Sequence, residues 1–257
     1  MEQYILDLLE KLFKIKSLPK NIRTYDVLHE DGNTYKHISP TGILSMISDV
    51  SNIPEENFQY GANFHKWVEE FIKSEYKLTL EVTNACPLKY LYFIYHIAKS
   101  DIYLKPEVQV NNNELCLSWT IDLLWFRDKV NIEIPRNYNL LLDHKTCQNV
   151  NSIDMETLYK YALQLLMYRI IMKREENHCK EYLSFIDKQG NYLKMPLEAI
   201  IPHSGFILSS IYMMIYYANF LANNPIKIYT RKDVVLEHIN SWDLPPDFTL
   251  YLTRALW

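Results

Sequence analysis

The spacing of hydrophobic positions divides the chain into a helical first part, a strand-rich middle and a mostly helical end. In the first part, apolar side chains recur every three or four positions, as they do in a helix with one buried face. This spacing predicts helices over residues 1–20, 42–50, 63–76 and 87–98. Ser39 and Thr41 both stand where a capping residue would start the second of these helices.

The middle of the chain changes from a helical period to the two-residue period of strands. Strands are predicted over residues 106–110, 115–126 and 138–146, followed by a long helix over residues 155–173. A hairpin of residues 181–187 and 192–195 would then turn at Gln189-Gly190-Asn191. Helices, three strands, a helix and further strands predict an α/β or α+β fold with a mixed central sheet.

One late segment is apolar enough to raise the question of a membrane. No charged side chain occurs from residue 199 to 226, and residues 205–222 are strongly apolar. A spanning helix needs roughly 20 mostly apolar residues, so this segment is of marginal length. Interspersed serine, tyrosine and asparagine residues favour a helix buried in protein. We therefore expect an intracellular protein with no membrane partner.

Composition narrows the class of protein without naming an activity. The 257 residues are 48% hydrophobic and 23% charged, as in folded globular proteins. The formal net charge of −4 gives no overall basic character, which argues against a protein that simply coats nucleic acid. It leaves room for an enzyme whose acidic site is neutralised by bound cations.

The four cysteines are far apart in the sequence and form no C-x-x-C pair. Free thiols in a reducing compartment are the expected state. Neither an iron–sulfur cluster nor a structural zinc site is expected, because the cysteines lack the usual ligand spacing.

The triplet Asp143-His144-Lys145 directly follows the apolar run Leu140-Leu141-Leu142. Residues two apart on a strand point to the same face, so Asp143 and Lys145 would project side by side from a buried strand. Charge is costly in such a place unless it is paired or holds a metal. An acid beside a lysine is what metal-dependent cleavage of a phosphodiester requires. Alone, this triplet is a weak signal.

Four further sequence elements are arranged in order around the triplet. They are Ser39-Pro40-Thr41-Gly42-Ile43-Leu44, Gly61-x-x-x-His65, Trp119-Thr120-Ile121-Asp122 and Gln164-x-x-x-Tyr168. Together, over residues 38–187, they resemble the RecB-like exonuclease branch of the PD-(D/E)XK nuclease superfamily. The chain departs from that pattern where Ser118-Trp119 replaces the usual glycine before the first acid, and it lacks the cluster-binding cysteines of some relatives.

The resemblance implies a restriction-endonuclease-like fold, with a mixed central sheet flanked by helices. A single nuclease domain would occupy residues 1–257, with its core at 38–187 and helical additions at 1–37 and 188–257. The resemblance also implies a magnesium or manganese site. Its metal ligands would be His65, Asp122, Asp143 and the backbone carbonyl of His144.

In catalysis, the resemblance assigns roles to Asp122, Asp143, Lys145, Gln164 and Tyr168. The carboxylates would hold a cation that activates water, and Lys145 would orient that water and offset charge on the phosphate. The implied activity is hydrolysis of DNA by an exonuclease acting on single strands or ends, in replication, recombination or repair. The alternatives are a structure-selective endonuclease and a catalytically silent nucleic-acid-binding relative.

Each residue also has a simpler interpretation. His65 could be a packed or surface histidine, Asp122 a solvated acid and Lys145 a surface lysine. Tyr168 could belong to the apolar stripe of its helix, whereas Gln164 on that stripe needs hydrogen-bond partners. The remaining acids near the sheet, Asp101, Glu107 and Asp154, are interpreted as structural or solvated, with a supporting place behind the metal ligands as the alternative for Glu107. The basic residues on or near the long helix could follow a phosphate backbone, but each is interpreted as part of a solvated charged face; they are Lys160, Arg169, Lys173 and Arg174.

Overall fold

The computed structural model describes residues 1–47, 55–79, 87–99, 102–127, 138–172, 180–201 and 205–223. Its strands form a mixed seven-stranded sheet in the order β1-β2-β4-β5-β6-β7, with β3 paired to β4. The predicted α/β class with a mixed sheet flanked by helices is therefore confirmed. The narrower restriction-endonuclease-like fold stays a prediction. Several sequence predictions lie outside the described residues, including Asp101, Lys173, Arg174 and the chain beyond residue 223.

Contacts divide the chain into two compact units. We call residues 1–50, 111–119 and 202–257 the hairpin unit, and residues 51–110 and 120–201 the sheet unit. Two long strands contribute residues to both: β3 (Tyr103–Asn112) and β4 (Leu117–Phe126).

In the hairpin unit, strands β1 (Thr24–Leu28) and β2 (Thr34–Ile38) form an antiparallel pair. The expectation of a helical addition over residues 1–37 is wrong for this segment. Aromatic and β-branched residues favour strands here, and Gly32 adopts a positive φ of 77° in the turn. Asp31 closes that turn by accepting a hydrogen bond from the Asn33 backbone at 2.9 Å.

Three helices complete the described part of this unit: α1 (Glu2–Phe13), α2 (Pro40–Ile47) and α8 (Gly205–Ala222). Ser39 accepts a hydrogen bond from the Gly42 backbone at 2.9 Å, which confirms one of the two predicted caps. Helix α1 ends earlier than predicted and packs against α8, where the Phe13 and Tyr217 rings meet edge to face at 5.0 Å.

Helix α8 has the length and composition of a membrane-spanning helix. However, 61% of its apolar window is buried inside the protein, and core helices of soluble proteins pass the same test. Among its buried residues is Asn219, which donates a hydrogen bond to the Leu115 carbonyl. These contacts agree with the expectation of a helix packed within protein.

In the sheet unit, β4 runs antiparallel to β5 (Leu140–Cys147), and β5 runs parallel to β6 (Lys180–Asp187). The predicted hairpin is confirmed, because β7 (Tyr192–Pro196) returns antiparallel to β6 through a turn in which Gly190 has a φ of 84°. Its Asp187 carboxylate accepts hydrogen bonds from the Gln189 and Asn191 backbone at 3.0 and 2.9 Å.

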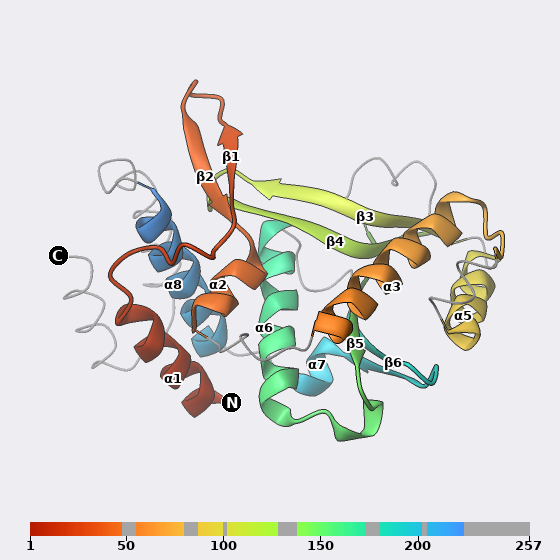
Figure 1. Ribbon diagram of the computed structural model, residues 1–257. Coiled ribbons are helices and arrows are strands. Elements are labelled where there is room, and N and C mark those ends of the chain that lie inside the picture. The colour runs from red at the N-terminus through yellow and green to blue at the C-terminus, as the bar shows by residue number, and fades with distance from the viewer. Residues whose placement is uncertain are drawn as a thin grey trace. The chain divides into compact units, whose positions relative to one another are not determined.

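Helices cover both faces of these strands. On one face, α3 (Glu55–Lys73) lies across the strands (Figure 1), and α3 and α5 (Leu88–Ala98) form a core with Leu123, Leu142 and Ile186. On the other face lies α6 (Met155–Ile171), preceded by a short 3₁₀ turn at Val150–Ser152, and α7 (Leu197–Ile200) contacts α6. This two-sided packing leaves the ends of the strands as the place for a site.

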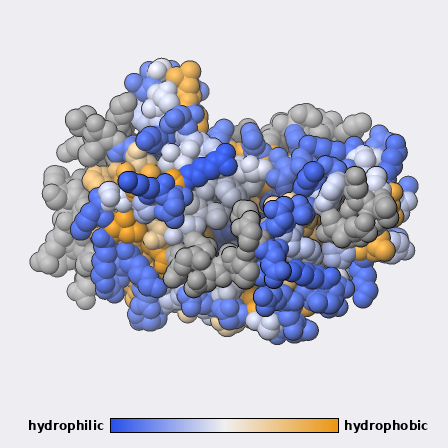
Figure 2. Space-filling model, viewed as in Figure 1, coloured by the Kyte–Doolittle hydropathy of each residue, from blue (hydrophilic) through white to orange (hydrophobic). Residues whose placement is uncertain are grey.

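One side of α5 stays outside this core. The helix buries Tyr90, Leu91 and Ile94, whereas Leu88 and Tyr92 are 57% and 65% exposed. Figure 2 shows hydrophobic residues at the surface over this helix. Only the inward face of α5 therefore contributes to the described core.

Candidate active site

Two neighbouring strands bring the predicted acids together. The pairing of β4 with β5 ends at Leu123 and Leu142, and Asp122 and Asp143 are the residues directly beyond that last pair. In addition, Asp122 Oδ2 accepts a hydrogen bond from the backbone N–H of His144 at 2.6 Å. The D-x-K triplet and the earlier acid thus lie close together on the sheet.

His65 approaches the same place from α3. Gly61 lies one turn earlier on this helix, and a Cβ atom there would come within 3.0 Å of the Thr146 hydroxyl oxygen on β5. The missing side chain permits a close approach of helix and strand. His65 Nδ1 then lies 3.5 Å from Asp122 Oδ1 and 3.8 Å from Glu107 Oε1.

Glu107 joins the candidate site, although from sequence it was interpreted as structural or solvated, with a supporting place behind the metal ligands as the alternative. His65, Glu107 and Asp122 offer ligand atoms within 4.8 Å of one another. Glu107 has a positive φ of 47°, which is rare for a non-glycine residue in a strand. The available signal was Pro106, since a proline inside a strand marks an edge or a bulge where the next side chain is redirected.

Asp143 and Lys145 form a buried ion pair on β5. Lys145 Nζ lies 2.8 Å from Asp143 Oδ2, and the two side chains are 16% and 1% exposed. The same ammonium lies 4.8 Å from the centre of the Tyr161 ring on α6. Lys145 is therefore fixed between a carboxylate and an aromatic face, which excludes the simple interpretation of a surface lysine.

Gln164 and Tyr168 extend this network from α6. The Tyr168 hydroxyl donates a hydrogen bond to Asp143 Oδ1 at 3.5 Å, and the Gln164 side-chain amide donates to that hydroxyl. Both residues are buried. The predicted Q-x-x-x-Y pair thus reaches the site through Asp143.

The crowding of charge shifts the pKa values of these groups. Burial raises the pKa of Asp143, whereas the charge of Lys145 lowers it. The net result is a raised pKa of about 6 for Asp143. Burial lowers the pKa of His65, but the Asp122 and Glu107 carboxylates outweigh it, so the pKa is raised. The pKa of Lys145 is likewise raised, because Asp143 and Asp122 outweigh the effect of burial. Lys145 is therefore a cation at neutral pH.

The side chain of His144 belongs to the opposite face, as predicted. Its Nδ1 atom lies 2.9 Å from the Tyr90 hydroxyl oxygen, and its ring packs edge to face with Phe64. Burial, together with His65 and Lys145, holds the pKa of His144 well below its usual value. This side chain is neutral and structural. Its backbone carbonyl stays a predicted ligand.

The donor set suits a hard divalent cation. Carboxylate oxygens are preferred by magnesium and manganese, and the group His65, Glu107 and Asp122 supplies two carboxylates and one imidazole. Asp143 is not in that group; its carboxylate contacts Lys145. The predicted role of Asp143 as a metal ligand stays a prediction.

Comparison of the sequence with protein-family models and with curated proteins finds no match.

Proposed function

We propose that this protein is a magnesium- or manganese-dependent DNA nuclease, acting as an exonuclease on single strands or DNA ends. One observation carries the proposal: Asp122, Asp143 and Lys145 meet on adjacent strands with His65 and Glu107 beside them. Paired carboxylates, an imidazole and a buried lysine form a set that suits hydrolysis of a phosphodiester. The resemblance to the RecB-like nucleases in residues 38–187 supports the same reaction.

His65, Glu107 and Asp122 would hold the cation, with Asp143 as a further candidate ligand. When bound, the cation would supply Lewis-acid stabilisation of phosphate charge and a lowered pKa for attacking water. In the reaction, water adds to phosphorus, the bond from phosphorus to the leaving oxygen breaks, and that oxygen takes up a proton.

Lys145 is the positively charged side chain that the protein itself supplies to the candidate site. Its ammonium can donate hydrogen bonds to the attacking water and to a phosphate oxygen whose negative charge grows in the transition state. The Asp143 carboxylate at 2.8 Å and the Tyr161 ring hold this ammonium in place. Tyr168 and Gln164 in turn orient Asp143. Because the acids and the lysine are all present, the catalytically silent alternative is less well supported.

The test is cleavage of end-labelled DNA by the purified protein with Mg²⁺ or Mn²⁺. Asp143→Asn and Lys145→Ala should each lower the cleavage rate by about 10²–10³-fold or more, since each removes a transition-state contact. Lys11→Ala, on an exposed position of α1, is the matched control and should cleave normally. Circular dichroism should show that all three variants are folded.

Chelation of divalent cations should abolish cleavage by the unaltered protein, and added Mn²⁺ should restore it. Full activity in folded Asp143→Asn or Lys145→Ala protein would overturn the proposal.

A further inference from the structure

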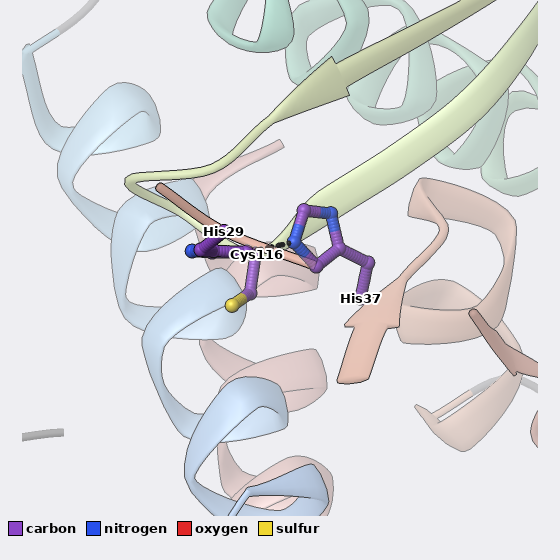
Figure 3. Close-up of side chains that lie close together, drawn as sticks. All are labelled: His29, His37 and Cys116. Carbon is purple, nitrogen blue, oxygen red and sulfur yellow. Dashed lines mark hydrogen bonds between the residues drawn. The ribbon is translucent and has the colours of Figure 1, made fainter. Parts of the chain in front are cut away.

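A second group of side chains that could bind a metal lies in the hairpin unit. It shares no residue with the proposed nuclease site. His29, His37 and Cys116 offer ligand atoms that all lie within 4.8 Å of one another. His29 directly follows β1, His37 is on β2, and Cys116 directly precedes β4. Figure 3 shows the Cys116 thiol beside the two imidazole rings.

The two imidazoles are already aligned nitrogen to nitrogen. Nε2 of His29 lies 2.7 Å from Nε2 of His37, and the interaction is drawn as a dashed line in Figure 3. A tetrahedral zinc ion with nitrogen ligands at about 2.0–2.1 Å would separate them by roughly 3.3 Å. A small opening of the pair therefore suffices to admit an ion.

The surroundings of His37 set the tautomer of its ring. Nδ1 of His37 lies 3.2 Å from the Leu117 carbonyl oxygen and 2.8 Å from the Ser118 hydroxyl. A carbonyl only accepts, so Nδ1 carries the hydrogen and Nε2 presents its lone pair toward His29. Metal-binding histidines are commonly oriented in this way, with the second nitrogen donating to a carbonyl.

Backbone geometry holds the third ligand in place. Cys116 has a positive φ of 46°, and its carbonyl accepts a hydrogen bond from the Ile38 backbone at 3.0 Å. Both Cys116 and His37 are fully buried, whereas His29 is half-buried at the edge of the group. One side of the group thus remains accessible for the entry of an ion.

We propose that His29, His37 and Cys116 form a binding site for a zinc-class divalent ion, with a fourth position left for water or a small ligand. Two imidazoles and a thiolate are donors that select such ions over magnesium. On binding, the Cys116 thiol loses its proton to solvent, and the hydrogen on Nε2 of His29 is replaced by one on Nδ1. The ion would fasten the β1–β2 hairpin to the start of β4.

The site departs from the sequence-based expectation of no structural zinc. That expectation rested on cysteine spacing, but the ligands here come from three separate segments. A strand pair and a turn bring them together, and no short sequence motif records this.

The experiment is a titration of chelator-treated, reduced, full-length protein with Co²⁺ as a spectroscopic probe, followed by competition with Zn²⁺. The unaltered protein should bind one Co²⁺ with a near-ultraviolet band from thiolate to cobalt, and Zn²⁺ should remove that band. Cys116→Ser should lose the band, while the control Cys147→Ser should keep it. An oxygen-rich site elsewhere in the protein gives no such band, so the reading is specific to thiolate ligation.

Because a buried cysteine substitution can unfold the protein, the half-buried His29 provides a second test. His29→Gln should weaken Co²⁺ binding strongly, whereas the control His96→Gln on α5 should leave it unchanged. Ser118→Ala should weaken binding by about 10-fold, because it removes a contact to Nδ1 of His37. Zn²⁺ at about 100 times its dissociation constant should raise the melting temperature of the unaltered protein by roughly 5–10 °C.

Absence of the thiolate band in folded, unaltered protein would overturn the proposal, as would a band unchanged in Cys116→Ser or His29→Gln. DNA cleavage is not part of this test, so the site stands or falls separately from the nuclease activity.

Discussion

At the scale of single residues, the buried carboxylate of Asp143 explains why a short triplet carried so much information. Three leucines precede it, and its side chain is 1% exposed. A charge in such a place must be paired, and Lys145 two residues later is the partner. The sequence alone therefore predicted the shared face of these residues, whereas the structure supplied their pairing.

Glu107 leads to a specific prediction, since it joins His65 and Asp122 in the candidate cation group. We expect Glu107→Gln to raise the Mg²⁺ or Mn²⁺ concentration needed for half-maximal cleavage by about 10–100-fold. The variant loses one carboxylate ligand but little volume. Cleavage rates measured across a series of cation concentrations will show the shift.

The matched control for Glu107→Gln is Glu69→Gln. Glu69 lies one helical turn after His65, but its carboxylate is paired with Lys73. Its cation dependence should equal that of the unaltered protein. Equal curves for all three proteins would remove Glu107 from the cation site.

Backbone geometry and long-range pairing explain why Glu107 and Arg169 were not assigned from sequence. The position of Glu107 depends on a positive φ inside β3, for which the preceding Pro106 was a weak local signal. Arg169 was interpreted as part of a solvated basic face, and this is wrong. It pairs with the fully buried Glu181, which also accepts a hydrogen bond from Tyr138 at 3.0 Å. The contacts of Glu181 with Arg169 and with Tyr138 join different elements of the chain.

At the scale of elements, the close approach of α3 to β5 depends on Gly61. Alanine favours helix over glycine by about 1 kcal/mol, so Gly61→Ala alone would be expected to stabilise α3. Its Cβ, however, would meet the Thr146 hydroxyl at 3.0 Å and push the helix outward. We expect little change in the free energy of unfolding but a clear fall in cleavage, because His65 moves with the helix.

A second substitution tests that explanation. Thr146→Ala removes the opposing hydroxyl, so the Gly61→Ala/Thr146→Ala protein should regain cleavage relative to Gly61→Ala. A double variant no more active than Gly61→Ala would show that contact between helix and strand does not set the position of His65.

Helix α6, which carries Gln164 and Tyr168, begins with a well-formed cap. Asp154 accepts hydrogen bonds from the backbone and hydroxyl of Thr157, both at 2.8 Å, and these hold its pKa below the usual value. Asp154→Ala should lower the free energy of unfolding by about 1 kcal/mol at neutral pH. Asp154→Asn, which can still accept from the backbone, should lower it less.

The pH dependence of this cap follows from the depressed pKa. The stabilisation by ionised Asp154 is present above the unfolded pKa of 3.8 and is lost as pH falls through the folded pKa. The difference in urea unfolding between the unaltered protein and Asp154→Ala should therefore shrink as the pH falls below 3.8. A difference that stayed constant would mean that charge at Asp154 contributes nothing.

Elements differed in how well the sequence predicted them. The strand β5, helix α6 and the β6–β7 hairpin followed from apolar runs, helical spacing and turn residues. The β1–β2 hairpin was not predicted, since its strands are five residues each and mostly polar or half-exposed. Such strands are stabilised by partners distant in sequence, here the pairing of Ile38 with Leu117.

At the scale of the whole molecule, the net charge of −4 means that phosphate binding must rely on local positive charge and bound cations. Lys145 is one such local charge, held in place between Asp143 and the Tyr161 ring. The sequence also offers three aromatic side chains that could stack on unpaired bases, Trp67, Tyr159 and Tyr161. The Tyr161 ring instead lies beneath Lys145 and 6.0 Å from Phe185, so we assign it to support of the lysine.

The last prediction concerns the form of DNA that is cut. Helices cover both faces of the strands that carry Asp122 and Asp143, which favours entry of a single strand from its end over binding of a continuous duplex. The resemblance to end-processing nucleases points in the same direction. Trp67 and Tyr159 remain candidates for stacking, a contact worth about 1–3 kcal/mol per base. We therefore expect linear single-stranded DNA to be degraded faster than duplex DNA.

Linear and circular single-stranded DNA of the same sequence provide the decisive comparison. Both forms offer identical bases and phosphates, so the protein should have the same affinity for the interior of either strand. Only the presence of an end differs between the two substrates. Linear DNA should yield short products while the circle persists under the same cation concentration. The Lys145→Ala protein should leave both forms uncut, and this result would exclude a contaminating nuclease as the source of cleavage. A circle cut at the rate of the linear form would instead assign the protein as an endonuclease, with its catalytic residues unchanged.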